Sequence, residues 1–280
     1  ANPAEPAAVT QFQTMALLHL AATAADLPVP RVVHTLSGAT EVGLPNGILR
    51  LLTYVEGTPL HSAQPTAAQR RSMARMGASL ARALRDFHHP AADHDLLWDI
   101  KQAARLRSLM PSIADPALQS LARRCLDTFD ADVAPQLQSL RWQVVHNDLN
   151  PHNVLVDPTD ADRISGVLDF GDMVHTPLIC DVAVAASYQI DRDNPLQSLI
   201  DFAAAWHSAD PLYPAELDQL FDLVATRMVT TIAITSWRAS RYPENAPYIL
   251  RNFPSAKAGL EAFANLPRAA VLHALKATCR

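Results

Sequence analysis

The sequence predicts an α+β protein of two unequal lobes, a small N-terminal lobe over residues 1–57 and a mainly helical C-terminal lobe over residues 58–280. Three observations predict this class. One helical pattern and two strand-like runs fill the first part, helical patterns fill most of the second, and two short apolar runs with polar loops interrupt the helical part at residues 144–173. With 280 residues, 49% of them hydrophobic, the chain can bury a sizeable core or two lobes.

The small lobe is expected to begin with a helix. Apolar residues recur at helical spacing from Val9 to Leu20, and two prolines end the pattern before residue 31. Two strand-like runs follow, separated by a turn rich in glycine and proline, and a Glu-Gly-Thr-Pro segment leads into the large lobe. The expected elements are a helix from about Ala4 to Asp26, strands over residues 31–36 and 47–55, and a linker over residues 56–59.

Helical patterns dominate the large lobe. Proline stands near the start of several of them, where a helix tolerates it because the first backbone nitrogens need no partner inside the helix. The expected helices cover residues 66–88, about 99–109, 117–137, 177–188, 195–207, 214–241 and 246–266.

Composition argues against several classes of protein. The net charge of -5 disfavours a nucleic-acid surface, which needs clustered lysine and arginine to replace counterions. No apolar run reaches the ~18 residues of a membrane span, and the N-terminus lacks a basic region before an apolar stretch. The cysteines at 125, 180 and 279 are odd in number and widely spaced, so neither a disulfide framework nor a zinc site is expected. A cytoplasmic protein fits these features best.

Two motifs carry the chemistry, His146-Asn-Asp148-Leu-Asn-Pro-His-Asn153 and Asp169-Phe-Gly-Asp172. Each follows an apolar strand-like run, so the two loops are expected to bring Asp148, Asn153 and Asp169 together. One carboxylate would then orient an acceptor hydroxyl, while an amide oxygen and a second carboxylate would hold Mg²⁺ against nucleotide phosphates. The pattern predicts a phosphoryl-transfer site.

Each piece of this pattern has an ordinary explanation when it stands alone. An isolated Asp-Phe-Gly or His-x-Asp is most often a polar cluster at a strand end. The combination at this spacing, with an apolar run on either side, rarely arises by chance. His146 and His152 are interpreted as hydrogen-bonding braces of the loop rather than as proton carriers.

Together with Arg241-Tyr-Pro-Glu-Asn245, these motifs resemble those of the aminoglycoside phosphotransferase and choline kinase superfamily over nearly the whole chain. The greatest likeness is to its hydroxylysine kinase branch and to the kinase-like domains fused to class III aminotransferases. The resemblance implies a protein-kinase-like bilobal fold with a truncated N-terminal lobe. By it, Asp148 is the catalytic base, and Asn153 and Asp169 are the Mg²⁺ ligands.

The same resemblance implies the partners of the reaction. Thr53, Tyr54 and Val55 would form the hinge beside the base of ATP or GTP, the co-substrate. The acceptor would be a hydroxyl of a small amino-alcohol similar to hydroxylysine, and fusion of the parent protein to an aminotransferase is a further expectation. Aminoglycoside, homoserine or choline kinase activity remains an alternative, as does a non-catalytic kinase-like binding domain.

The chain departs from that family at its nucleotide site. The family's phosphate-binding lysine lies in a strand before the first helix, but no lysine precedes Lys101 here, and the acidic partner on the helix is replaced at Gln11. Truncation is favoured over a pseudo-enzyme, because two strands alone would leave apolar surface and strand edges uncovered. The 280-residue chain is expected to be weakly active or inactive.

Several other residues are candidates for support or for substrate binding. Asp181 opens a helix and resembles the family's acidic residue that hydrogen-bonds the catalytic loop, so Asp181 and His146 are expected to support that loop. Among the others, a carboxylate would attract a substrate ammonium and an arginine a substrate carboxylate. A solvated turn explains Asp172 equally well, and a helix cap, core packing or solvation is the favoured explanation for the rest. These substrate-binding candidates are Trp98, Asp99, Asp172, Arg227, Trp237 and Arg238.

Overall fold

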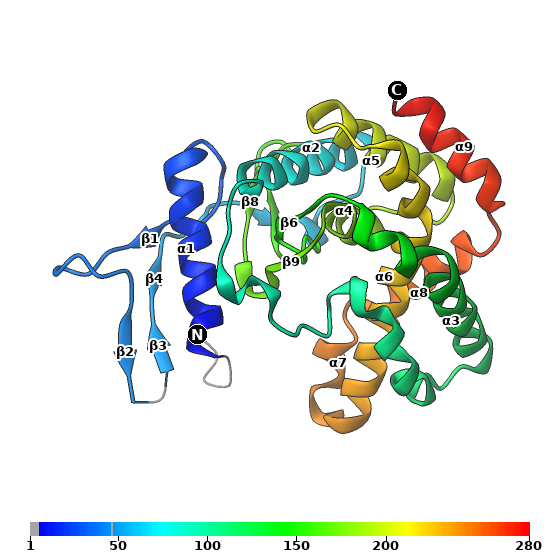
Figure 1. Cartoon of the computed structure of the whole chain (residues 1–280), viewed down its shortest axis with the longest axis horizontal. Coiled ribbons are helices and arrows are strands. Elements are labelled where there is room, and N and C mark those ends of the chain that lie inside the picture. The colour runs from blue at the N-terminus through cyan, green and yellow to red at the C-terminus, as the bar shows by residue number, and fades with distance from the viewer. Residues whose placement is uncertain (1–5, 46) are drawn as a thin grey trace.

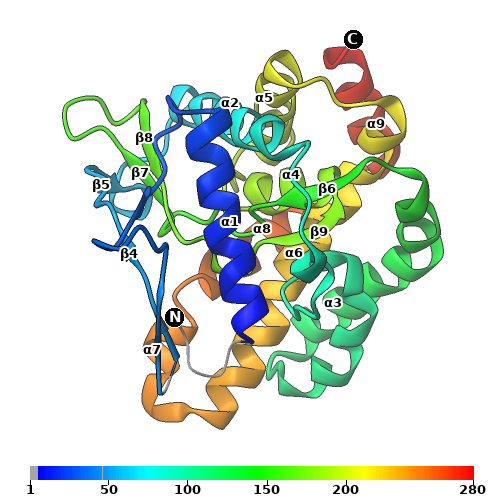
Figure 2. The same cartoon turned by 60° about the vertical axis from the view of Figure 1, so that its left-hand side comes forward.

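The computed structural model describes residues 6–45 and 47–280, and it confirms the two-lobed α+β architecture (Figure 1). One helix and four short strands form the small lobe at one side, and the turned view shows this helix running alongside the large lobe (Figure 2). The expected helix start at Ala4 lies outside the described residues. The elements of the small lobe are α1 (Ala7–Thr23), β1 (Val32–Val33), β2 (Val42–Leu44), β3 (Gly47–Leu49) and β4 (Leu51–Leu52).

The strands of the small lobe are shorter and more numerous than the sequence predicted. β1 pairs antiparallel with β4, and β2 pairs antiparallel with β3, as two separate two-stranded sheets. β2 lies in the segment interpreted as a turn, and the second expected strand is interrupted at Arg50. The Arg50 guanidinium donates to Gln13 Oε1 (2.9 Å) and to the Thr10 carbonyl oxygen (3.3 Å) of α1. The arginine therefore ties the strands to α1 at the point where regular pairing stops.

A third sheet joins the small lobe to the large one. β5 (Thr58–Pro59), in the segment expected to be a plain linker, pairs antiparallel with β7 (Val154–Val156), which pairs in turn with β8 (Ile164–Val167). Gly57 comes just before β5 with φ 153°, and a Cβ there would lie 2.7 Å from Leu155 Cβ. Glycine is needed for this backbone conformation and for this close approach. The proposed domain boundary after residue 57 lies where the chain enters β5 and passes from the small lobe to the large one, and it stays a prediction.

Helices build most of the large lobe, as expected from the sequence. Beyond β5, β7 and β8, its elements are η1 (Leu60–Ser62), α2 (Ala67–Leu84), η2 (Pro90–Asp93), η3 (Ile100–Ser112), α3 (Pro116–Thr128), η4 (Phe129–Val133), η5 (Ala134–Ser139), β6 (Trp142–Val145), η6 (Phe170–Asp172), β9 (Val174–Pro177), α4 (Leu178–Ser187), α5 (Pro195–Ala209), α6 (Pro214–Arg241), η7 (Pro243–Asn245), α7 (Ala246–Ile249), α8 (Phe253–Phe263) and α9 (Arg268–Thr278). No helix in the described part of the chain is both long and apolar enough to span a membrane.

The helix ends differ from the sequence prediction mainly near prolines. The helix expected to reach residue 137 is α-helical only to Thr128 and continues as a π turn and a 3₁₀ turn that contains Pro135, which offers no backbone donor. The last expected helix is divided into α7 and α8, and Pro254 stands in the first turn of α8 because it cannot continue a preceding helix. The sequence interpretation missed β9, which pairs antiparallel with β6, and α9.

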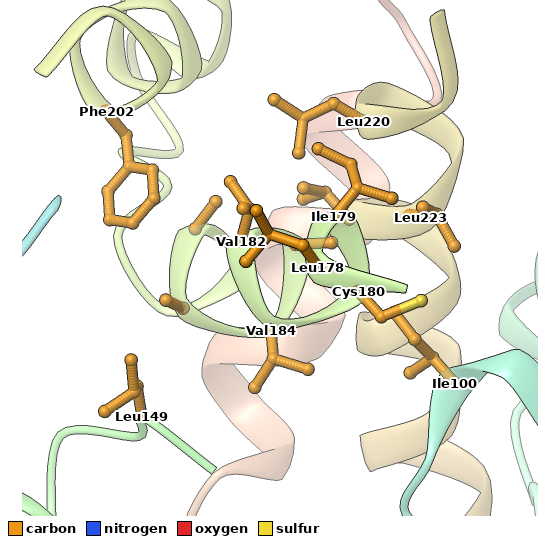
Figure 3. Close-up of a cluster of buried hydrophobic side chains, with 14 of the residues drawn as sticks. Ile100, Leu149, Leu178, Ile179, Cys180, Val182, Val184, Phe202, Leu220 and Leu223 are labelled. Carbon is orange, nitrogen blue, oxygen red and sulfur yellow. The ribbon is translucent and has the colours of Figure 1, made fainter. Parts of the chain in front are cut away.

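α4 lies at the centre of the large lobe. Its residues Leu178–Ala186 are all buried, because a helix that is apolar on every side must be enclosed by its neighbours. Figure 3 shows Phe202 of α5 on one side of α4 and Leu223 of α6 on the other, with Leu149 from the loop after β6 near its end. Leu149 is itself fully buried. The core therefore anchors the loop that carries Asp148.

α2 and α5 pack so closely that one glycine has no room for a side chain. A Cβ at Gly77 of α2 would lie 2.4 Å from Cζ3 of Trp206 on α5. Gly77→Ala is expected to lower the free energy of unfolding by about 1–3 kcal/mol, because overpacking outweighs the gain in helix propensity. Gly43→Ala is the control, since no atom lies within 4 Å of a Cβ at that position. Urea unfolding measures both variants, and equal stabilities would contradict the close packing.

Candidate active site

A buried histidine holds the loop after β6. His146 Nδ1 accepts a hydrogen bond from the Asp148 backbone N–H (3.2 Å), so Nε2 must donate to the Leu168 carbonyl oxygen, 3.0 Å away. Burial lowers the pKa of His146, which favours the same neutral imidazole. The ring also packs edge-on against Phe170, with 4.8 Å between ring centroids. His146 thus ties the Asp148 loop to the strand end that precedes Asp169.

Asp181 supports the same loop from the buried helix α4. Its Oδ1 accepts a hydrogen bond from the Asn147 backbone N–H at 2.7 Å, and Asn147 has a left-handed backbone with φ 63°. Desolvation by burial raises the pKa of Asp181 to about 7, although the Asn147 N–H acts in the opposite direction. The chain turn that presents Asp148 therefore depends on a carboxyl group buried in the core.

Asp181→Asn is expected to change how stability depends on pH. The carboxyl titrates near 3.8 in its ordinary state and near 7 when folded, so the folded wild type loses stability as the pH rises from about 4 to about 7. Asparagine keeps an oxygen for the Asn147 N–H and has no proton to lose. The free energy of unfolding of the variant should therefore rise relative to the wild type across this window, by on the order of 1–4 kcal/mol. Urea unfolding at about pH 5 and about pH 7.5 measures the change, and a constant difference would contradict it.

Both oxygens of the Asp148 carboxylate have partners. Oδ2 accepts from Asn150 Nδ2 (2.8 Å) and from Asn153 Nδ2 (2.7 Å), and Oδ1 accepts from Arg227 Nη2 (3.2 Å). Asn153 Nδ2 also donates to the Asp148 carbonyl oxygen (3.1 Å). The amide nitrogen of Asn153 is thus fully engaged with Asp148, which leaves its Oδ1 as the atom available to another ligand.

The β7–β8 hairpin brings Asn153 and Asp169 to the same end of the sheet. Val154 pairs with Val167, and the Leu168 N–H donates to the Asn153 carbonyl oxygen at 2.7 Å, so Asn153 and Asp169 flank the last pair of the ladder. Asp169 has a left-handed backbone with φ 58°, and its Oδ1 accepts from the Gly171 N–H (3.1 Å). The strand register, rather than proximity in the chain, places these two residues side by side.

Asp148 and Asp169 line one cavity of about 270 Å³. The two carboxylates suit an Mg²⁺ ion, which is commonly held by one or two carboxylates with substrate phosphates completing its shell. Asn153, the other predicted ligand, does not line the cavity itself but is hydrogen-bonded to Asp148. In the part of the chain that is described, no group of three or more histidine, cysteine, aspartate or glutamate side chains is arranged to hold a metal by itself. Binding of Mg²⁺ at this site stays a prediction.

The structure brings some of the predicted substrate residues to this cavity and not others. Trp98, Asp172, Arg227 and Arg238 line it. Asp99 does not: it is 1% exposed, it accepts from the Thr176 hydroxyl (3.1 Å), and it caps η3.

Trp237 is the other predicted substrate residue that does not line the cavity. It lies beneath the guanidinium of Arg241, 5.3 Å from the ring centroid. Its position on α6, next to Arg238, places the ring on a different face of the helix.

The predicted hinge does not line this cavity either. Thr53 pairs with Arg31 through its backbone N–H (2.9 Å) and its hydroxyl (2.9 Å), and Tyr54 is 87% exposed. Val55 packs over β8, where a Cβ at Gly166 would lie 2.7 Å from Val55 Cγ1. The segment lies between the lobes, and its contact with a nucleotide base stays a prediction.

Sequence reasoning missed several residues of the site. The α1 side chain that faces the Asp-Phe-Gly loop is Gln13, whose Nε2 donates to the Gly171 carbonyl oxygen (3.2 Å), whereas Gln11 is exposed. The helical period that puts Gln13 on the buried face with Phe12 would have identified it. Tyr188 and Arg251 also line the cavity, and no local pattern distinguishes them from other surface residues.

The fold and the site together define a protein of the kinase-like class, with a small lobe set against a helical lobe and paired acidic loops between them. Residues 1–220 match the sequence model described as the phosphotransferase enzyme family, and the chain belongs to that family. It is 29% identical to the hydroxylysine kinase of Mus musculus over 219 residues, which cover 74% of this chain and 58% of that protein. The chain thus spans less than two thirds of that relative's length.

Solved structures show the same fold. A microcompartment-associated aminopropanol kinase superposes with a TM-score of 0.67 at 20% identity, over 94% of this chain and 84% of that one. An amicoumacin kinase in complex with AMP-PNP, Ca²⁺ and Ami superposes with a TM-score of 0.65 at 12% identity, over 94% of this chain and 80% of that one. At these identities the likeness establishes the fold alone.

Proposed function

We propose that this chain carries the catalytic site for transfer of the γ-phosphoryl group of ATP or GTP to a hydroxyl of a small amino-alcohol, with weak activity at most in the 280 residues alone. The observation that carries the proposal is that Asp148 and Asp169 line one cavity while Asn153 is hydrogen-bonded to Asp148. Phosphoryl transfer depends mainly on positioning and on stabilising spread charge, and this arrangement supplies both kinds of group. Membership of the phosphotransferase enzyme family supports the same reaction class.

The residues have separate roles in the proposed reaction. Asp148 accepts a hydrogen bond from the acceptor hydroxyl and orients it, and takes its proton as the new bond forms. Asn153 Oδ1 and the Asp169 carboxylate hold Mg²⁺, which neutralises phosphate charge when it is bound. Thr53, Tyr54 and Val55 are proposed to contact the nucleotide base. The cytoplasm is the proposed location, because a reducing compartment is in keeping with the free thiols of Cys125, Cys180 and Cys279.

The charges around the cavity support a small acceptor with mixed charge. Asp172 offers a carboxylate to an ammonium group, and Arg227, Arg238 and Arg251 line the same space of about 270 Å³. A polycation such as an aminoglycoside is favoured by a broad acidic cleft, whereas the three carboxylates of this cavity are balanced by three guanidinium groups. Hydroxylysine, the substrate named for the mouse relative, is therefore the first acceptor to test.

The test is a panel of acceptors with ATP and with GTP, read by mass spectrometry of the phosphate ester. Hydroxylysine, 1-amino-2-propanol, homoserine, choline and kanamycin cover the substrate classes, each with magnesium and with EDTA. The 280-residue chain and the full reading frame that contains it are assayed together. At least one of the two polypeptides is expected to form the phosphate ester of an amino-alcohol in the presence of magnesium. Absence of product from every acceptor with both polypeptides would defeat the proposal.

A second candidate is a non-catalytic domain that binds a small amine. The observation that favours it is that two neutral amides stand on α1: Gln11, the position at which the acidic partner of a nucleotide-binding lysine was expected, and Gln13, which donates to the Gly171 carbonyl oxygen. Mass action separates the two functions, because a ligand stabilises the protein that binds it. A rise in Tm with magnesium and nucleotide supports the kinase, and a rise with amine alone supports the binding domain.

A further inference from the structure

Arg227 is a charged side chain at a position where a charge is costly. It lies midway along α6, its side chain is 1% exposed, and it is among the largest fully buried side chains of the large lobe. Removing a guanidinium from water costs several kcal/mol in real proteins unless its partners compensate. The identity of those partners therefore indicates what the residue does.

The partners of Arg227 come from three separate elements of the fold. Nη2 donates to Asp148 Oδ1 (3.2 Å) and to the Tyr188 hydroxyl (3.1 Å), and Nη1 donates to the Trp98 carbonyl oxygen (3.1 Å). The ring centroids of Trp98 and Tyr188 lie 5.3 and 5.7 Å from the guanidinium carbon. The planar fork is thus held at a fixed angle, which a lysine ammonium could not reproduce.

The guanidinium is charged and incompletely paired. Burial acts to lower the pKa of Arg227, but Tyr188 and then Asp148 outweigh it, and the pKa is raised. Nε is buried with no partner among the described residues. Among the described residues, the carboxylate that forms an ion pair with this buried charge is that of Asp148, at 3.2 Å, so the arginine is tied to the reacting group.

We propose that Arg227 is the positioning residue of Asp148. This inference rests on the proposed function. Arg227 holds Oδ1 while Asn150 and Asn153 hold Oδ2, so the carboxylate is fixed from both ends before an acceptor arrives. The remaining lone pairs then meet the acceptor hydroxyl in one orientation, which removes the cost of ordering the carboxylate during the reaction.

This role differs from the contact with a substrate carboxylate that the sequence suggested for Arg227. The donors that a substrate could pair with from solvent are those of Arg238 and Arg251, which line the same cavity and are exposed. Arg227 lies against the reacting group instead. Phosphorylation should therefore depend on Arg227 to the same extent for acceptors with a carboxylate and for acceptors without one. Only acceptors with a carboxylate should depend on Arg238.

The test compares Arg227→Met with Arg238→Met as the matched control, using hydroxylysine and 1-amino-2-propanol as acceptors. Arg227→Met is expected to lower kcat about 100-fold for both acceptors with KM changed little, as for misplacement of a reacting group. Arg238→Met is expected to raise KM for hydroxylysine alone. A selective rise in the KM for hydroxylysine in Arg227→Met would overturn the inference, because it would make Arg227 a substrate contact.

A double-mutant cycle separates positioning from general damage to the fold. Because Arg227 acts through Asp148, adding Arg227→Met to Asp148→Asn should cost no further activity, whereas a second 100-fold loss would count against the proposal. Tyr188→Phe removes one hydrogen bond of Nη2 and keeps the ring, so it should lower kcat in the same direction by a smaller factor. Tyr188→Phe is the variant to use in these tests if Arg227→Met does not fold.

Unfolding provides a readout that needs no activity. Asp148→Asn is expected to lower the urea midpoint of the wild type, because Arg227 loses its counter-charge, and to leave the midpoint of Arg227→Met unchanged. Additive shifts would show that the two residues are not coupled and would refute the inference. If the wild type phosphorylates no acceptor, the proposed function fails, and this cycle still decides whether Arg227 holds Asp148.

Discussion

Asp148→Asn is expected to lower kcat for phosphoryl transfer by about 10²–10⁴-fold, the largest effect on turnover of any single change. Asparagine has the shape of aspartate, but it neither takes the proton of the acceptor hydroxyl nor carries the charge that orients it. KM for the nucleotide should change much less, because the nucleotide is held by other groups. Steady-state kinetics with the acceptor identified in the panel measures both quantities.

The control for Asp148→Asn is Asp172→Asn, a second carboxylate of the same cavity. It is expected to raise the acceptor KM while leaving most of kcat. The free energy of unfolding of Asp148→Asn should also fall, by up to about 3–5 kcal/mol, because Arg227 remains buried without a counter-charge. Circular dichroism therefore accompanies the kinetics, and a folded Asp148→Asn variant with undiminished kcat would remove Asp148 from the reaction.

Asp169→Asn is expected to abolish most of the stabilisation that magnesium and nucleotide give to the protein. A ligand present at about 100 times its Kd stabilises the folded state by about 2.7 kcal/mol, and loss of the anionic oxygen should remove most of this amount. Asp169 is exposed, and asparagine can still accept from the Gly171 N–H, so the ligand-free variant should match the wild type. Thermal unfolding with and without magnesium and ATP gives the difference.

The matched control for Asp169→Asn is Asp193→Asn, an exposed aspartate in the loop before α5 whose replacement should alter neither state. With EDTA present, ATP should stabilise the wild type no more than magnesium and ATP stabilise Asp169→Asn. Equal stabilisation of Asp169→Asn and wild type by magnesium and ATP would exclude Asp169 as the metal ligand.

The sequence predicted those features that are encoded within a few residues of each other. The order of the lobes, most of the helices and the two acidic motifs follow from hydrophobic period and from contiguous residues. Strands were predicted less well, because β1 and β4 are two residues long and depend on partners elsewhere in the chain. β5 looked like a linker, since its pairing with β7 has no local signal.

The tertiary structure separates substrate-site candidates that lie next to each other in the sequence. Asp99 and Trp98 are adjacent in sequence, but Trp98 lines the cavity and Asp99 turns into the core to meet Thr176. Gln13 and Gln11 are two residues apart on α1, and only Gln13 contacts the Asp169-Phe-Gly171 loop. A helix turns by 100° per residue, so a shift of two positions moves a side chain to the opposite face.

By itself, the sequence determined the two compact motifs that supply the candidate residues Asp148, Asn153 and Asp169, whose residue types suit magnesium and phosphate. Only the tertiary structure decided what holds them. Arg227 is 79 residues from Asp148 and Asp181 is 34 residues from Asn147, and both contacts exist because α4 and α6 are buried together. Such contacts depend on how helices pack around a shared core, and packing of distant segments leaves no local pattern to detect.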